Sequence, residues 1–224
     1  MNIIKRRPFL FFDVYATLFK KKKIKELGVS NETEIVIEGF PRCANTFAVI
    51  SFEMSQSKKK FKIAHHLHVP AQVVRGVNLG KPVLILIREP EEAVKSLLIR
   101  HTSISSNKAF RSYISFYNIV LESIDKVIVA DFSIIINNFD RVIQAVNTKF
   151  NVDFEVPEIN GENESEIFSK IDRVNQISDG GRESHVARPS LDRGSSQPII
   201  PESHLKRKAK ALYDNLCQFS LKLD

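Results

Sequence analysis

The chain has 224 residues, of which 43% are hydrophobic and 26% charged, so its composition is that of a globular protein with a sizeable core. Two distant cysteines exclude a disulfide-stapled scaffold and favour a reducing, cytoplasmic compartment. The net charge of +7 is concentrated in residues 1–30, where eight basic and two acidic residues give +6. Because the other residues contribute only +1, the charge does not predict nucleic-acid binding.

Residues 1–30 are predicted to form a basic, amphipathic N-terminal arm that precedes a domain at 31–224. Its aromatic segment, residues 8–19, is too short to span a bilayer and contains Asp13. The segment also lacks the small-residue cleavage site of a signal peptide. Two interpretations stay open, because both need the same amphipathic pattern. The arm either packs on the domain, which we favour, or makes peripheral contact with a membrane through its lysines.

Segments with strand and helix patterns alternate along the domain. The expected strands are 35–37, 61–64, 83–87 and 126–130. The expected helices are 46–54, 71–78, 90–100, 107–123, 134–150, 162–171 and 201–221, with a loop at 180–198. The continuous apolar run at 83–87 is typical of a strand buried on both faces. The alternation predicts an α/β three-layer sandwich with a mainly parallel central sheet.

The segment Gly39-Phe40-Pro41-Arg42-Cys43-Ala44-Asn45-Thr46 joins the first strand to the first helix. Backbone N–H groups at such a helix start attract phosphate or sulfate, and Arg42 adds a fixed cation. Asn45 and Thr46 add hydrogen-bonding side chains, whereas we read Cys43 as a packing residue. No Gly-Lys-Ser/Thr sequence closes the loop, which argues against an ordinary ATP or GTP enzyme.

Polar residues follow each of the four predicted strands. In chain order, they are Arg42, then His65, His66 and His68, then Arg88, and then Asp131. Ligands of parallel sheets bind outside the carboxyl ends of the strands. These side chains are therefore expected to meet at one edge of the sheet and to form a single active site. For Asp131, capping of the next helix is an equally good interpretation.

The loop 39–46, taken with the segment Arg88-Glu89-Pro90-Glu91-Glu92-Ala93-Val94-Lys95-Ser96, resembles the sulfotransferases that use 3′-phosphoadenosine 5′-phosphosulfate (PAPS). The resemblance implies a P-loop-NTPase-like fold. It also implies that Arg88 and Ser96 hold the 3′-phosphate. The residues implied to hold the 5′-phosphosulfate are Pro41, Arg42, Cys43, Ala44, Asn45 and Thr46. The chain departs from the family pattern at three positions, with Arg42 for a usual Lys, Cys43 for Ser and Ala44 for Gly.

The segment His66-Leu67-His68-Val69-Pro70 resembles the family's Lys-Thr-His-Leu-Pro segment. This alignment implies that His68 is the catalytic base and that His66 stands at the Lys position, although the register among His65, His66 and His68 stays open. Arg188 and Arg193 resemble a late basic segment that closes over the 3′-phosphate, and the resemblance does not decide between them.

The implied activity is transfer of a sulfuryl group from PAPS to an acceptor hydroxyl, with release of 3′,5′-bisphosphoadenosine (PAP) and without a metal. The acceptor is expected to be a carbohydrate, lipid or other small hydroxyl compound. A neutral His with a pKa near ~6.5 could accept the hydroxyl proton, while Arg42 and the loop amides stabilise the anionic transition state. Two rival hypotheses are a small-molecule P-loop kinase and a membrane-associated PAP-binding protein without catalysis.

Overall fold

The computed structural model describes residues 2–18, 21–158, 161–179 and 198–222. Its centre is a parallel sheet of four strands, β1 (Ile35–Gly39), β2 (Ile63–His65), β3 (Val83–Ile87) and β4 (Ile128–Asp131), in the order β2-β1-β3-β4. The register pairs Val36 with Val83 and Leu84 with Ile128. Every residue of β1 and β3 is buried, as the apolar runs predict for strands covered on both faces.

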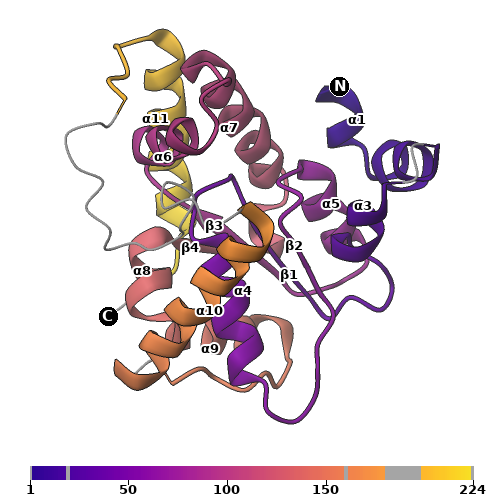
Figure 1. The fold of residues 1–224 in the computed structure, drawn as a ribbon. Helices are drawn as coiled ribbons and strands as arrows, with labels where there is room; N and C mark the ends of the chain where they lie inside the picture. Colours follow the sequence, from indigo (N-terminus) through magenta and orange to yellow (C-terminus); the bar gives the residue numbers. More distant parts are fainter. Residues whose placement is uncertain (1, 19–20, 159–160, 180–197, 223–224) are drawn as a thin grey trace.

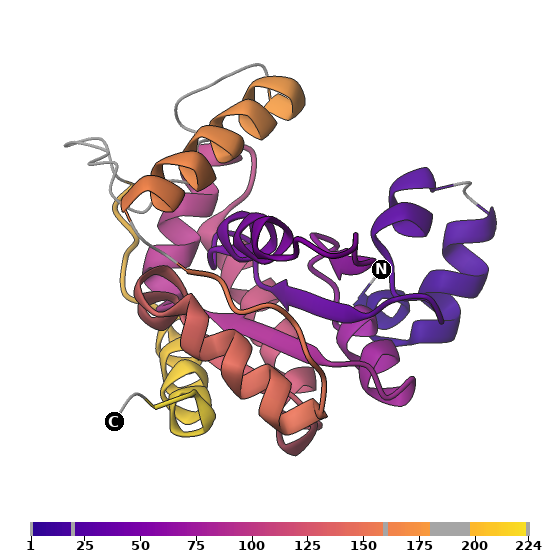
Figure 2. The same cartoon turned by 90° about the horizontal axis from the view of Figure 1, so that it is seen from below.

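Helices cover both faces of the sheet, which confirms the predicted α/β class (Figure 1). Helix α4 (Asn45–Ser55) lies on one face, where Phe47 packs against Phe139 of α9 (Phe139–Phe150) and Phe168 of α10 (Gly161–Asp179). Helices α5 (Pro70–Asn78) and α7 (Ser106–Leu121) lie on the opposite face (Figure 2). Helices α6 (Pro90–Arg100) and α11 (His204–Phe219) pack against α7, and a short 3₁₀-helix, η2 (Ile124–Lys126), precedes β4.

Two predicted helices differ from the observed ones. The single helix expected at 134–150 is divided into α8 (Phe132–Asn137) and α9, because Asn138 leaves the helical region with φ −144° and ψ 44°. The helix expected to end at residue 171 continues to Asp179 in α10. No Gly or Pro marks either position, so the sequence lacks the strongest helix-breaking signals there.

The N-terminal arm folds into α1 (Asn2–Arg6), the π-helix η1 (Phe9–Tyr15), α2 (Ala16–Leu18) and α3 (Lys22–Leu27). Figure 1 shows these elements beside α5 and β2. The arm and the β2–α5 segment share a second apolar cluster, formed by Phe11, Ala16, Ile24, Val69 and Ala71. The packed interpretation of the arm is therefore the one the structure shows. No helix in the described ranges is both long and apolar enough to cross a bilayer.

Candidate functional site

The site is centred on the carboxyl ends of β1 and β3, where the following connections lead to opposite sides of the sheet. Such a switch point leaves a crevice in which ligands of α/β proteins bind. Gly39 allows the two strands to approach closely here, since a Cβ atom at this position would lie 2.4 Å from the carbonyl oxygen of Leu86. The loop that follows β1 therefore begins directly beside the end of β3.

The loop between β1 and α4 has the geometry of an anion-binding turn. Arg42 and Ala44 both have left-handed backbone angles, with φ of 73° and 64°. Left-handed residues within a tight turn direct successive N–H groups into a concave nest that suits an anion. Within the described chain, no side-chain hydrogen bond caps the first turn of α4. The predicted loop thus presents backbone donors, as expected for a phosphate- or sulfate-binding element.

The side chains of two residues of this loop, Asn45 and Cys43, face its interior and stabilise the turn. The Asn45 amide nitrogen donates a hydrogen bond to the Phe40 carbonyl oxygen over 3.0 Å, which closes the turn. Cys43 is fully buried, and burial raises the pKa of its thiol to about 12. A thiol with such a pKa is protonated at neutral pH, so Cys43 is a packing residue, as predicted.

Three polar residues from different elements meet at the crevice. Arg42 Nε donates to Ser96 Oγ of α6 over 2.9 Å, and Arg88 Nη1 donates to the Arg42 carbonyl oxygen over 3.1 Å. The Arg88 guanidinium also lies 4.2 Å from the centre of the Phe132 ring. The structure thereby brings together the residues that the two sequence motifs contributed separately. Two half-buried guanidinium groups at one strand edge form a cationic surface suited to phosphate.

Two tyrosines of α7 hold this arrangement in place, and the sequence analysis assigned no role to either beyond the expected helix 107–123. The Tyr117 hydroxyl donates to the Leu86 carbonyl oxygen over 2.6 Å and accepts from the Phe40 N–H over 3.1 Å. The Tyr113 hydroxyl donates to the Arg88 carbonyl oxygen over 2.9 Å. Two tyrosines four residues apart lie on one helix face, and buried tyrosine hydroxyls need hydrogen-bond partners. That spacing was the sequence signal for their role.

His65, the last residue of β2, and His66 and His68 after it form a cluster that leads to the anion loop. His65 Nδ1 and His66 Nδ1 lie 2.6 Å apart, and His66 Nε2 lies 3.1 Å from Thr46 Oγ1. His68 Nδ1 donates to the Gly39 carbonyl oxygen over 2.8 Å. A carbonyl oxygen can only accept, so neutral His68 carries its proton on Nδ1. Its Nε2 is then a free acceptor, and no described residue hydrogen-bonds to it.

Burial changes the acid–base properties of these rings. Desolvation lowers the pKa of His65 and of His68 to about 4, and it lowers the pKa of His66 well below the usual value. The positive charge of Lys23 acts on all three rings in the same direction. The expectation of an ordinary pKa near 6.5 was therefore wrong. The rings are neutral at physiological pH, but they are weaker bases than free histidine.

A buried carboxyl group that sequence reasoning missed shapes the histidine turn. Glu38 Oε2 accepts hydrogen bonds from the backbone N–H groups of Leu67 and His68 and from the Gln72 side chain. Burial raises the Glu38 pKa to about 8. His66 and His68 both have left-handed φ angles, which these backbone contacts help to hold. An acid inside an apolar strand run was the signal, since a buried carboxyl needs hydrogen-bonding partners.

The remaining predicted residues lie elsewhere or are not described. Asp131 caps α8 through Ser133 N–H and accepts a hydrogen bond from the Tyr213 hydroxyl over 2.7 Å, so it has the capping role. Pro41 is half-buried in the loop. Arg188 and Arg193 lie outside the described residues. Among the residues that the structure describes, no group of three or more His, Cys, Asp or Glu is placed to hold a metal ion.

Fold and site together define an α/β protein with a cationic crevice at the β1–β3 switch point, whose geometry suits an anion, and with a histidine cluster beside it. No family model and no curated protein matches the sequence. Among solved structures, a crystal structure of mouse sulfotransferase SULT7A1 complexed with PAP is similar to this chain at a TM-score of 0.44 and 10% identity, over 67% of each chain.

Proposed function

We propose that this protein is a PAPS-dependent sulfotransferase that transfers a sulfuryl group to an acceptor hydroxyl. The observation that carries the proposal is the meeting of Arg42, Arg88 and Ser96 at the anion loop, next to a histidine with a defined tautomer. The residues have the chemistry that a nucleotide with two anionic groups and a hydroxyl nucleophile require.

The proposed donor site uses the two ends of the cationic crevice. The nest at Arg42 and Ala44 with the start of α4 would hold the phosphosulfate end, and Arg88 with Ser96 would hold the 3′-phosphate. Because Arg42 Nε is bonded to Ser96, its guanidinium lies on the α6 side of the loop and would contribute to both ends. A bound PAPS molecule would supply the activated sulfuryl group.

In the proposed reaction, His68 Nε2 accepts the proton of the acceptor hydroxyl. A bond forms between that oxygen and the sulfur, while the bond between sulfur and the phosphate oxygen breaks and PAP leaves with the electron pair. Arg42 and the loop N–H groups stabilise the charge that develops on the transferred group and the leaving oxygen, an effect worth a few kcal/mol in comparable sites (about 2.7–4 kcal/mol per donor). Arg42 acts by charge and geometry, because a guanidinium does not give up its proton.

The proposal is tested by separating nucleotide binding from turnover. His68→Asn should retain PAP affinity within about twofold. It should lower the rate of PAP release from PAPS in the presence of hydroxyl acceptors by about 10²–10⁴-fold, because that is the usual contribution of a general base. His204→Asn on α11 is the matched control and should keep wild-type turnover. If His68→Asn turned over at the wild-type rate, His68 would not be the base.

A second candidate is a membrane-associated PAP-binding protein without catalysis. It is favoured by three exposed apolar side chains on the arm, Ile3, Phe9 and Leu18, which stand among its basic residues. This candidate predicts PAP binding without turnover. It also predicts sedimentation with anionic vesicles that is lost when all three residues are replaced by Ser. The kinase hypothesis instead requires Mg²⁺-dependent ATP turnover, which the loop sequence does not favour.

A further inference from the structure

A cavity of about 470 Å³ lies between the N-terminal arm and the turn that follows β2. Its volume is within the range of about 300–1,000 Å³ that is usual for small-molecule sites. One wall is apolar and includes Phe11 and Tyr15, whose rings stack with centroids 6.0 Å apart, and Val69. The predicted transfer reaction does not use this cavity.

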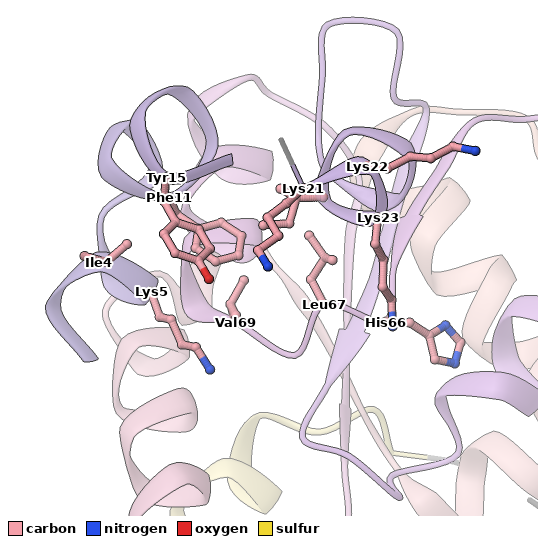
Figure 3. A pocket seen from close by; sticks show the side chains of 11 residues that line it. Ile4, Lys5, Phe11, Tyr15, Lys21, Lys22, Lys23, His66, Leu67 and Val69 are labelled. Atoms are coloured by element: carbon pink, nitrogen blue, oxygen red, sulfur yellow. The ribbon is translucent and has the colours of Figure 1, made fainter. Parts of the chain in front are cut away.

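The other wall of the cavity is cationic. Four lysines line it, Lys5, Lys21, Lys22 and Lys23. Within the described chain, only Lys22 of these four forms an ion pair with a carboxylate. Figure 3 shows Lys21 directed toward Leu67 and Val69, and Lys23 extending toward His66, whereas Lys22 points away. Lys22 is also the one that pairs with Glu26, at 3.5 Å. An apolar wall beside cations without counter-charges is complementary to a molecule with a hydrocarbon part and an anionic group.

His66 connects this cavity to the anion loop. Its ring lines the cavity, and its Nε2 lies 3.1 Å from Thr46 Oγ1 at the start of α4. A molecule in the cavity would therefore lie on the histidine side of the crevice, away from Arg88 and Ser96. Its anionic group would also face the positive charge of Lys23, which acts on the same ring.

We propose that this cavity binds one molecule of an anionic amphiphile, with its hydrocarbon chain against Phe11, Tyr15 and Val69 and its anionic head group at Lys21 and Lys23. The binding does not depend on the proposed transfer reaction. The chemistry is shared by a free alkyl phosphate or fatty acid and by a lipid extracted from a bilayer. In both cases, a single molecule occupies the cavity.

Calorimetric titration of the full chain with decyl phosphate, kept below its micelle concentration, tests the proposal. We expect saturable binding at one site. Decanol, which lacks the charge, and inorganic phosphate, which lacks the chain, should each bind at least tenfold more weakly, because a charge-assisted contact is worth about 1.4 kcal/mol or more. Equal binding of decanol, or no binding of decyl phosphate, would overturn the proposal.

Charge variants of neighbouring residues locate the head group. The double variant Lys21→Gln/Lys23→Gln should weaken decyl phosphate binding about tenfold or more, because it removes the two proposed charge contacts. Lys22 also lines the cavity, but its side chain points away and pairs with Glu26. Lys22→Gln, a single charge change in the same segment, should therefore leave the affinity within about twofold. If both variants weakened decyl phosphate binding equally, the anion would be attracted by the overall charge of the arm, and the proposed head-group site would be wrong. Thermal unfolding of each variant, with a midpoint close to wild type, establishes that the fold is kept.

A vesicle experiment separates a single bound molecule from a bilayer surface. Anionic phosphatidylserine vesicles are compared with neutral phosphatidylcholine vesicles, using the wild type and Phe9→Ser. Phe9 does not line the cavity. If Phe9→Ser binds decyl phosphate as the wild type does, this supports binding inside the cavity. Binding to anionic vesicles without binding of decyl phosphate would overturn the proposal and favour a membrane surface.

Discussion

Glu38 and the histidines that it positions show how single residues set the chemistry of the site. The carboxyl group is fully buried in β1 and holds the backbone of the turn that carries His68. The same turn gives His68 Nδ1 its contact with the Gly39 carbonyl oxygen. Glu38 is therefore a positioning residue for the proposed base. Because burial raises its pKa to about 8, it is protonated in the folded protein at neutral pH.

This raised pKa predicts a pH dependence of stability. In the unfolded chain Glu38 has the usual glutamate pKa of 4.5, whereas the folded protein keeps the proton up to about pH 8. Stability contributed by the protonated carboxyl is complete below pH 4.5 and is lost as pH rises to about 8. Glu38→Gln should therefore flatten the free energy of unfolding across this window, as measured by urea denaturation at several pH values.

The exposed Glu122 supplies the control, and Glu122→Gln should keep the wild-type slope. Unchanged pH dependence in Glu38→Gln would show that Glu38 does not bind its proton more tightly in the folded state. Glu38→Ala removes the acceptor of three hydrogen bonds and should destabilise the protein at every pH, by about 1–3 kcal/mol for each donor left unsatisfied.

Helices and strands were predicted correctly from the sequence where a short, local residue pattern defines them. The run 83–87 was correctly predicted to be a strand, β3, and the helix expected at 90–100 begins and ends as predicted, in α6. The division between α8 and α9 could not be predicted, because Asn138 takes a non-helical conformation that no Gly or Pro marks. The meeting of Arg42 with Ser96 follows from strand order, which motifs alone do not give.

Helix α7 offers a test of how an element supports the site. Tyr117→Phe leaves the Phe40 N–H and the Leu86 carbonyl oxygen without this partner, and it should lower the free energy of unfolding by about 1–3 kcal/mol. Tyr113→Phe removes one contact, with the Arg88 carbonyl oxygen, so its effect should be smaller. Urea denaturation of both variants checks the order. A larger loss for Tyr113→Phe would contradict the role given to Tyr117.

At the scale of the whole molecule, the arm is part of the packed structure and supplies most of the lining of the proposed amphiphile cavity. Phe11 is 4% exposed and belongs to the second apolar cluster, whereas Phe9 is 67% exposed. The amphipathic pattern predicted a helical arm but could not show which domain surface covers it. That surface comes from residues 69–71, which are distant in sequence.

The two phenylalanines form a matched pair for testing the arm. Phe11→Ala should destabilise the arm by about 3 kcal/mol, the lower end of the range for a buried Phe, and Phe9→Ala should change stability by less than about 0.5 kcal/mol. Hydrogen exchange of the amides in residues 9–18 measures the local effect, and urea denaturation measures the global one. Equal, small effects of both substitutions would indicate that the arm does not pack on the domain in solution.

Isothermal titration calorimetry with PAP is the sharpest test of the proposed PAP site in the β1–β3 crevice. We expect saturable binding of PAP by the wild type and by Arg111→Ala, an exposed control on α7. Arg88→Ala should weaken binding by about tenfold or more, because a charge-assisted phosphate contact is lost. ATP with Mg²⁺ should bind negligibly. Binding of ATP with Mg²⁺ but not of PAP, or equal PAP affinity in Arg88→Ala and wild type, would contradict the account.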